Sequence, residues 1–308
     1  MKTTMKSRCK CPAANGTAQR NRTKHAFTLI ELVVVIATVA ILTAVLLPAL
    51  AGGKYPSKII NCASNFKSWT TMANVYASDD PKGMYPSFVA ATSGADPTDV
   101  STNFILNLAP YGFTIPMFFC PVRDFEFNGA NAEFRNGASP PVTFPLPPIA
   151  QAIPPHHKDM SSLSDLVVWI NARANNQYFA KLIYDWWVPR SSSVGGPMWP
   201  APNSASFSTG IAPPGCPGWP SKPSDPFMGN QPIISDIAEV GGAGVTTVAA
   251  GEATIPKITQ NKFNAHQYPI GTLSSINLGF GNGGVETHGV ADIHWQYSGN
   301  GESDSYFY

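Results

Sequence analysis

One apolar segment near the N-terminus constrains this 308-residue chain more than any other feature. It runs from Phe27 to Ala51, and its only ionisable side chain is Glu31, in the fifth position. About 20 consecutive apolar residues suffice for a helix to cross a membrane. A carboxylate near the middle of a bilayer costs at least ~2.5–3.5 kcal/mol, so an acid in such a segment usually marks function. The segment therefore predicts a membrane helix in which Glu31 has a specific role.

A basic leader precedes this segment. Residues 1–26 contain seven Lys or Arg residues and no Asp or Glu. Because positive charge stays on the cytoplasmic side, we expect a single-pass protein with a cytoplasmic leader and a periplasmic or extracellular head. A secretory signal peptide fits less well, since its apolar region is only about 7–15 residues long. A plain signal anchor accounts for the length and the charges but gives no reason for Glu31.

The junction reads Lys24-His25-Ala26, followed by Phe27-Thr28-Leu29-Ile30-Glu31. This pattern resembles the N-terminus of type IV pilins and type II secretion pseudopilins, in which a small residue precedes F-T-L-I-E. The resemblance implies cleavage by a prepilin peptidase between Ala26 and Phe27 and N-methylation of Phe27. Gly is the usual residue before the cut, so Ala26 is a departure. Pro48 also fits, because helices of this family often carry a proline near the end of the apolar stretch.

The resemblance also implies a role for Glu31 in assembly. Cleavage would leave a cationic amine on Phe27, and an acid four residues along a helix lies roughly 6 Å away along the axis. In filaments of this family, Glu is expected to pair with the amine of the neighbouring subunit. Such a pair offsets the desolvation of both charges and disfavours a staggered register. The alternative is an unpaired acid that reaches the lipid headgroups.

Three further segments resemble pseudopilin-like proteins abundant in planctomycete and verrucomicrobial bacteria. Their motifs are C-x-x-N-L-K-Q with a later Y-x-x-D and Pro, then F-x-C-P, and a C-terminal N-V-x-F-x-D-G-H-V-E. The corresponding segments here are Cys62–Pro86, Phe118–Pro121 and Ile276–Glu286. Asn282 and Gly284 replace the Asp and His of the last motif, which argues against a metal or catalytic role there. Residues 130–260 have no counterpart.

The predicted fold class is α+β and pilin-like, with a long N-terminal membrane helix packed on an antiparallel β-sheet head with long Pro/Gly-rich loops. Apolar residues recur every three or four positions over residues 57–80, which predicts a continuation of the helix. Gly52, Gly53 and Pro56 predict a kink or break before it. The predicted parts are a cleaved leader (1–26), a membrane and assembly helix (27–51), the continuation helix (57–80) and a β-rich head (81–308).

The head is expected to be rich in loops and strands, because the chain has 29 Pro and 26 Gly but only 13% charged residues. Leu163–Ile170 is predicted as a strand or a short helix, and Asn282-Gly283 as a hairpin turn. The strands predicted in the C-terminal part are Ile233–Ile237, Val245–Ala249, Leu273–Phe280, Val285–His288 and Asp292–Tyr297.

Removal of the leader would leave three cysteines: Cys62, Cys120 and Cys216. The compartment outside the inner membrane permits disulfides, and an odd number allows at most one bridge within the chain. Cys62–Cys120 is our first pairing hypothesis. Buried free thiols are the alternative.

Two other groups of residues suggest ligands. Glu286, His288, Asp292 and His294 would lie on one face if they were on strands, and could hold a cation such as calcium. A polar outer sheet face is the simpler interpretation, and no other cofactor is expected. Aromatic residues could form a carbohydrate-binding surface or pack inside the head: Trp186, Trp187, Trp199 and Trp219.

The sequence carries none of the common hydrolase, zinc-protease, phosphate-loop or dinucleotide-binding motifs, so no enzyme is expected. Without its leader the chain has 13 basic and 19 acidic residues, which does not suggest nucleic acid. The favoured function is a pseudopilin, and the resemblance implies as partners other pilin-like subunits, prepilin peptidase and an inner-membrane secretion platform. The alternative is a surface pilin or adhesin whose head binds a glycan or a cell surface. A membrane-tethered hydrolase has no motif in its favour.

Overall fold

The computed structural model describes fourteen stretches of the chain: 27–88, 96–101, 103–139, 152–172, 180–190, 210–211, 213, 215–241, 245, 247–258, 260, 264–268, 271–299 and 305–308. The chain divides into two compact units, an N-terminal unit (residues 1–51) and a unit here called the head (residues 52–308). The basic leader and Ala26 lie outside the described residues.

A single helix, α1, extends from Leu29 to Asp79 and contributes to both units. It continues through Gly52, Gly53 and Pro56, so of the two alternatives predicted there, a break is wrong, and a kink stays a prediction. Proline removes one backbone hydrogen bond, but a helix that is already nucleated on both sides gains one bond for each further residue. Propagation from the two flanking segments therefore outweighs a single missing bond.

The N-terminal part of α1 is apolar and exposed. Every residue from Phe27 to Leu47 has an exposed side chain. Leu29–Leu47 is, within the described part of the chain, the one helical segment long and apolar enough to cross a membrane by length and composition.

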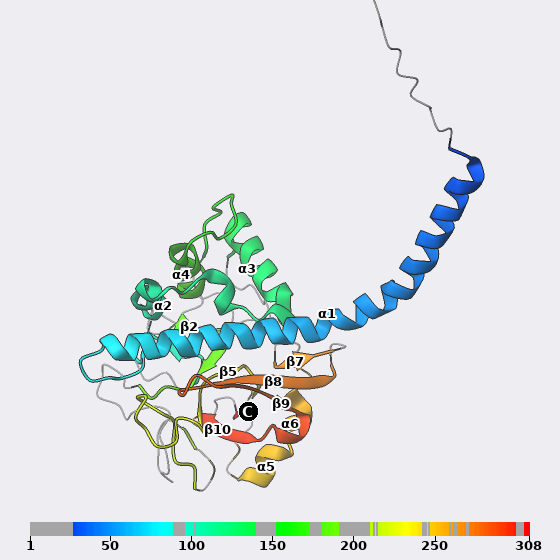
Figure 1. Ribbon diagram of the computed structural model, residues 1–308. Coiled ribbons are helices and arrows are strands. Elements are labelled where there is room, and N and C mark those ends of the chain that lie inside the picture. The colour runs from blue at the N-terminus through cyan, green and yellow to red at the C-terminus, as the bar shows by residue number, and fades with distance from the viewer. Residues whose placement is uncertain are drawn as a thin grey trace, which may run out of the picture. The chain divides into compact units, whose positions relative to one another are not determined.

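Within the head, the second half of α1 lies between a group of helices and a sheet (Figure 1). Phe66, Trp69 and Ala73 are fully buried, at the spacing of one helix face. On the helical side, the ring of Trp69 lies 4.5 Å from that of Phe113. On the sheet side it lies 5.5 Å from the ring of Trp186. The predicted continuation helix is thus present, and it is enclosed on two sides.

The helical side is built from short elements. Its α-helices are α2 (Phe104–Leu108), α3 (Asp124–Asn136) and α4 (Leu163–Asn171), and its 3₁₀ turns are η1 (Ala109–Tyr111), η2 (Ile115–Phe118) and η3 (Pro121–Arg123). The choice between strand and helix for Leu163–Ile170 is settled as helix, because Ser162 and Asp165 form a reciprocal capping box at its start. A two-stranded ladder of β1 (Asp99–Val100) and β2 (Ala180–Lys181) is separate from the sheets described next.

The first sheet is antiparallel and contacts α1 directly. Its described strands have the order β3 (Tyr184–Trp186), β5 (Pro232–Asp236), β8 (Leu273–Phe280) and β7 (His266–Gln267), and β9 (Val285–Gly289) pairs with β8. The predicted strand Leu273–Phe280 and the hairpin after it are confirmed. Gly283 has a φ of +82° in the turn, a conformation that glycine adopts without strain.

Alternate residues of β8 face opposite layers. Asn277 and Gly279 face α1, where the Asn277 amide donates to the carbonyl of Ile59 at 3.2 Å. Ile276 and Leu278 instead belong to a second core beneath the sheet.

That core also contains the second antiparallel sheet, whose described strands have the order β4 (Gly210–Ile211), β10 (Trp295–Gly299), β11 (Ser305–Phe307) and β6 (Glu239–Val240). The head is therefore α+β with antiparallel sheets, as predicted.

Two predicted strands are corrected by the structure. The predicted strand Val245–Ala249 is wrong, because a helix, α5 (Val248–Glu252), begins within it and the Thr247 side chain caps it by accepting from the amide of Ala250. A second short helix, α6 (Ile255–Ile258), follows. The strand predicted over Asp292–Tyr297 begins only at Trp295, since a 3₁₀ turn, η5 (Val290–Asp292), precedes it.

Gly279 on β8 lies close to α1, and this yields a stability prediction. A Cβ at Gly279 would lie 2.7 Å from Ile234 Cγ2 and 2.8 Å from Thr70 Cγ2. Gly279→Ala should therefore lower the free energy of unfolding by about 1–3 kcal/mol through overpacking. The measurement is urea unfolding of the full chain in detergent, followed by tryptophan fluorescence.

Gly53→Ala is the matched control, because Gly53 is also a glycine of the helix-to-head region but a Cβ there meets no atom within 4 Å. Alanine should stabilise the helix there by roughly 0.5–1 kcal/mol. Equal destabilisation by both substitutions would contradict the close approach at Gly279.

Candidate functional site

The start of α1 holds Glu31 in a local hydrogen-bond arrangement. The backbone N–H and the hydroxyl of Thr28 donate to Glu31 Oε2 at 2.8 and 2.6 Å. The Glu31 N–H in turn donates to Thr28 Oγ1 at 3.3 Å. Reciprocal bonds between a threonine and a glutamate three residues later are a capping box, which satisfies donors left free at a helix start. The T-x-x-E part of the motif therefore also has a structural function, and it places the helix start at Leu29.

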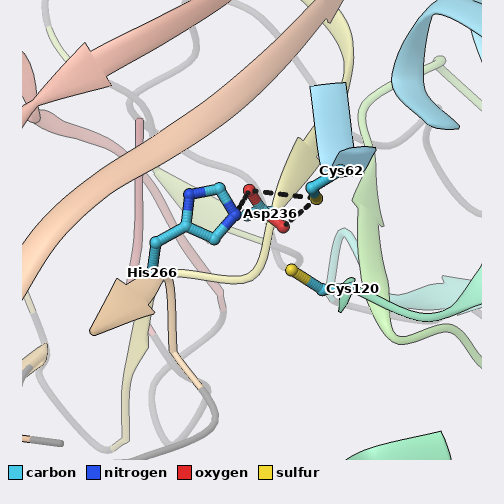
Figure 2. A group of neighbouring side chains, drawn as sticks. All are labelled: Cys62, Cys120, Asp236 and His266. Atoms are coloured by element: carbon cyan, nitrogen blue, oxygen red, sulfur yellow. Dashed lines mark hydrogen bonds and ion pairs between the residues drawn. The ribbon is translucent and has the colours of Figure 1, made fainter. Parts of the chain in front are cut away.

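The head contains a buried cluster that the sequence did not predict as a group. It consists of Cys62 on α1, Cys120 just before η3, Asp236 at the end of β5 and His266 at the start of β7. One potential ligand atom from each residue lies within 4.8 Å of the others, and all four residues are buried. Figure 2 shows the two sulfur atoms, the carboxylate and the imidazole pointing toward one another.

Asp236 is the centre of this cluster. Its Oδ2 lies 2.9 Å from His266 Nε2, and its Oδ1 accepts from the Cys62 thiol at 3.6 Å. The backbone N–H of Asn277 on β8 also donates to Oδ2, at 2.9 Å. His266 Nε2 and the carboxylate are close enough to form an ion pair. The Nε2–H bond does not, however, point at a hydrogen-bond acceptor among the described residues.

A buried arginine lies beside the cluster. Arg123 Nη1 is 3.8 Å from Asp236 Oδ1 and donates to the carbonyl of Ala265 at 3.0 Å. Its Nε donates to Glu126 Oε1 at 2.7 Å. Arg123 and Glu126 are 2% and 1% exposed, so both side chains depend on protein partners rather than on water.

The surroundings set the charges of the cluster. Burial alone lowers the pKa of His266, but the Asp236 carboxylate raises it to about 10. Burial alone raises the pKa of Asp236, but His266 and Arg123 lower it below the usual value. Burial raises the pKa of Glu126 to about 8, although Arg123 opposes this. His266 and Asp236 thus form a buried ion pair at neutral pH.

The two thiols are inequivalent. Burial raises the pKa of Cys62 well above the usual value. Burial alone would also raise the pKa of Cys120. A hydrogen bond with Cys62 and the positive charges of Arg123 and His266 outweigh this effect, so the pKa of Cys120 is lowered. Cys120 is therefore the side chain of the pair that more readily becomes a thiolate.

The structure brings together the two cysteines paired in our disulfide hypothesis, but as free thiols. Cys216 is also a buried free thiol, in the second core. Together with a carboxylate and an imidazole, Cys62 and Cys120 form a donor set suited to a metal ion.

The other predicted acid and histidine group is not brought together. His288 Nε2 lies 3.3 Å from Glu286, its neighbour but one on β9. His294 instead contacts Glu252 of α5 at 3.2 Å. The four residues would share one face only on a continuous strand. The 3₁₀ turn η5, which ends at Asp292, interrupts the strand, so the even spacing no longer places them on one face.

The three tryptophans of this group that the structure describes do not form a carbohydrate-binding surface. Trp186 and Trp187 are fully buried and Trp219 is 2% exposed, so they belong to the two cores. Trp199 lies outside the described residues. Among the described tryptophans, the packing interpretation is thus the correct one.

Sequence reasoning missed Asp236 and His266. The cluster residues come from four separate segments, so no local spacing motif connects them. One signal was available, because Asp236 lies between Ile233–Ile234 and Ile237 in a segment predicted as a strand. A charged side chain in a buried strand needs partners, but the sequence does not show which ones.

Comparisons of the chain with protein-family models, curated proteins and solved structures find no match. The resemblance to pilins therefore depends on the motif residues themselves.

The buried arginine gives a prediction about stability. Arg123→Ala should lower the free energy of unfolding by about 3–5 kcal/mol, because it leaves buried carboxyl groups without their cation. Adding Glu126→Gln in the same chain should recover part of this loss, since one uncompensated acid is removed. Urea unfolding of the full chain in detergent measures both effects.

Lys58→Ala is the control for this experiment. Lys58 pairs with Asp124 at 2.7 Å, but their side chains are 40% and 62% exposed. Water screens this pair, so the loss should be at most ~1 kcal/mol. A loss after Arg123→Ala as small as that after Lys58→Ala would contradict the importance of the buried pair.

Proposed function

We propose that this protein is a pseudopilin, a structural subunit that is anchored in the inner membrane and assembles into a short filament of a type II secretion-type system. The observation that carries the proposal is the continuous helix α1, which is apolar and exposed at its start and buried in the head at its end. A filament subunit needs both features, since one end must pack among other subunits and the other must support a folded head.

The dimensions of α1 support membrane insertion. Leu29–Leu47 has 19 residues, which at about 1.5 Å per residue span ~28 Å, close to the ~30 Å hydrocarbon core of a bilayer. Its apolar side chains are exposed on all faces of the helix. In water such a surface would be unstable, so lipid or other apolar helices are expected to cover it.

The capping box supports the role of Glu31. Thr28, whose amide donates to the Glu31 carboxylate, directly follows Phe27, the residue that would carry the new amine after cleavage. The carboxylate is therefore already oriented toward the end of the helix at which that amine would form. The amine of a neighbouring subunit would therefore meet a carboxylate that the capping box at the start of α1 already holds in place.

The head contributes packing rather than catalysis. Its described residues bury the second half of α1 between aromatic side chains and the first sheet. The burial of Trp186, Trp187 and Trp219 also removes a sequence argument for a glycan-binding adhesin. The partners in this proposal are other pilin-like subunits, prepilin peptidase and the secretion platform of the inner membrane.

The central test is Glu31→Ala combined with mass spectrometry of the N-terminus. We expect the wild-type chain to begin at N-methyl-Phe27, and the variant to be inserted and cleaved but neither methylated nor assembled. Loss of the carboxylate removes the partner of the amine, whereas the apolar segment that directs insertion remains. Cross-linking in membranes measures assembly.

Glu286→Ala is the control variant, because Glu286 is an exposed acid of the head. It should be processed and assembled as the wild type is. A wild-type protein in the membrane that still begins at Met1 would rule out the pseudopilin function.

Ala26→Gly tests the departure from the family pattern. Since glycine is the usual residue at this position in the family, we expect the precursor to be converted to the mature form faster. Pulse-labelling of the two chains gives the rates. A slower conversion would place the cleavage at another bond.

A further inference from the structure

We propose that Cys62, Cys120, Asp236 and His266 bind a Zn²⁺ ion in a closed, tetrahedral site inside the head. The proposal depends only on the geometry of the head and is independent of the pseudopilin function. It rests on the convergence of four potential ligand atoms, all within 4.8 Å of one another, in four buried residues from separate parts of the chain.

The spacing of the four atoms is close to that of a zinc site. With Zn–S bonds of about 2.3 Å and Zn–N or Zn–O bonds of about 2.0 Å, tetrahedral ligands lie roughly 3.3–3.8 Å apart. In the cluster, Asp236 Oδ2 lies 2.9 Å from His266 Nε2 and 3.9 Å from Cys62 Sγ. No separation exceeds 4.8 Å. Small side-chain rotations would therefore complete the coordination.

The donor types favour zinc over calcium or magnesium. Two thiolates and an imidazole are soft or borderline ligands, whereas calcium and magnesium prefer oxygen. Four protein ligands leave no open position for water or substrate, which is typical of a structural site. The ion would therefore stabilise the fold rather than catalyse a reaction.

The surrounding residues already orient the ligands. His266 Nδ1 lies 3.1 Å from Ser275 Oγ, so this nitrogen can keep its proton while Nε2 faces the cluster. The backbone N–H of Asn277 holds the Asp236 carboxylate at 2.9 Å. Partners of this kind fix the tautomer and the direction of metal ligands.

The charges of the occupied site also balance. Zn²⁺ would replace the two thiol protons and the Nε2 proton of His266, so that two thiolates, one carboxylate and the ion carry a net charge of −1. Arg123, 3.8 Å from Asp236, supplies the compensating positive charge. The released protons go to solvent, so binding should weaken as the pH falls.

The site would connect four elements of the head. Cys62 belongs to α1, Cys120 to the segment before η3, Asp236 to β5 and His266 to β7. A metal ion would thus link the buried part of α1 to both of the layers that enclose it. Since the ligands converge only in the folded head, the free energy of zinc binding would contribute to folding.

The test measures zinc in the full chain, purified from membranes in detergent and under reducing conditions. We expect one zinc ion per wild-type chain by plasma mass spectrometry, and almost none in Cys120→Ser. Cys216→Ser is the matched control, because Cys216 is another buried thiol but lies outside the cluster, and it should retain the metal.

A second variant covers the case in which Cys120→Ser fails to fold. Ser275→Ala keeps all four ligands and removes only the partner of His266 Nδ1, so the Kd for Zn²⁺ should rise about 10–100-fold. Replacement of zinc by Co²⁺ in the wild-type chain should also give the thiolate-to-metal absorption of a tetrahedral site.

Two results would overturn the proposal. One is a Cys62–Cys120 disulfide in the chain isolated in parallel without reductant, seen as a mass lower by two hydrogens and as thiols that are not labelled after unfolding. The other is a folded, reduced wild-type chain that binds no zinc when Zn²⁺ is added.

Discussion

The fully buried carboxylate of Asp236 is the constraint on which the architecture of the head depends. An isolated charge away from water is strongly unfavourable unless it is paired and hydrogen-bonded. Its partners come from every layer around it: Cys62 from α1, Asn277 from β8, His266 from β7 and Arg123 from η3. The layers of the head cannot separate without leaving this charge unpaired, whether or not a metal ion occupies the cluster.

The sequence predicted those elements whose signal is local. The membrane-length helix, the strand Leu273–Phe280 and its hairpin at Gly283 follow from apolar runs and turn residues that are contiguous in the chain. The strand predicted over Val245–Ala249 was wrong, because the helix cap at Thr247 and the packing of the head outweigh the weak strand propensity of this segment. Of the kink or break predicted over Gly52, Gly53 and Pro56, the break was wrong for a similar reason, since the helical segments on both sides overcome one missing hydrogen bond.

The buried cluster could be predicted only in part. The pairing of Cys62 with Cys120 was only a first hypothesis among the three cysteines left after removal of the leader, and the structure places the two side chains together. Asp236 and His266 come close only through the pairing of β5 and β7 with β8. Strand pairing over such separations depends on tertiary structure, which no local pattern contains. The Thr28–Glu31 box, in contrast, was visible in the sequence but was interpreted only through its family resemblance.

The close packing around Gly279 has a mechanical consequence. Thr70 and Ile234 approach this glycine so closely that no side chain fits between them. If α1 moved by one turn along its axis, Phe66 or Asn74 would have to occupy the place of Thr70, and both are larger. Axial displacement of the helix is therefore blocked by steric interlocking, in addition to hydrogen bonds. Under a pulling force, the buried part of α1 and the first sheet would therefore move together, because the helix cannot slide along the sheet.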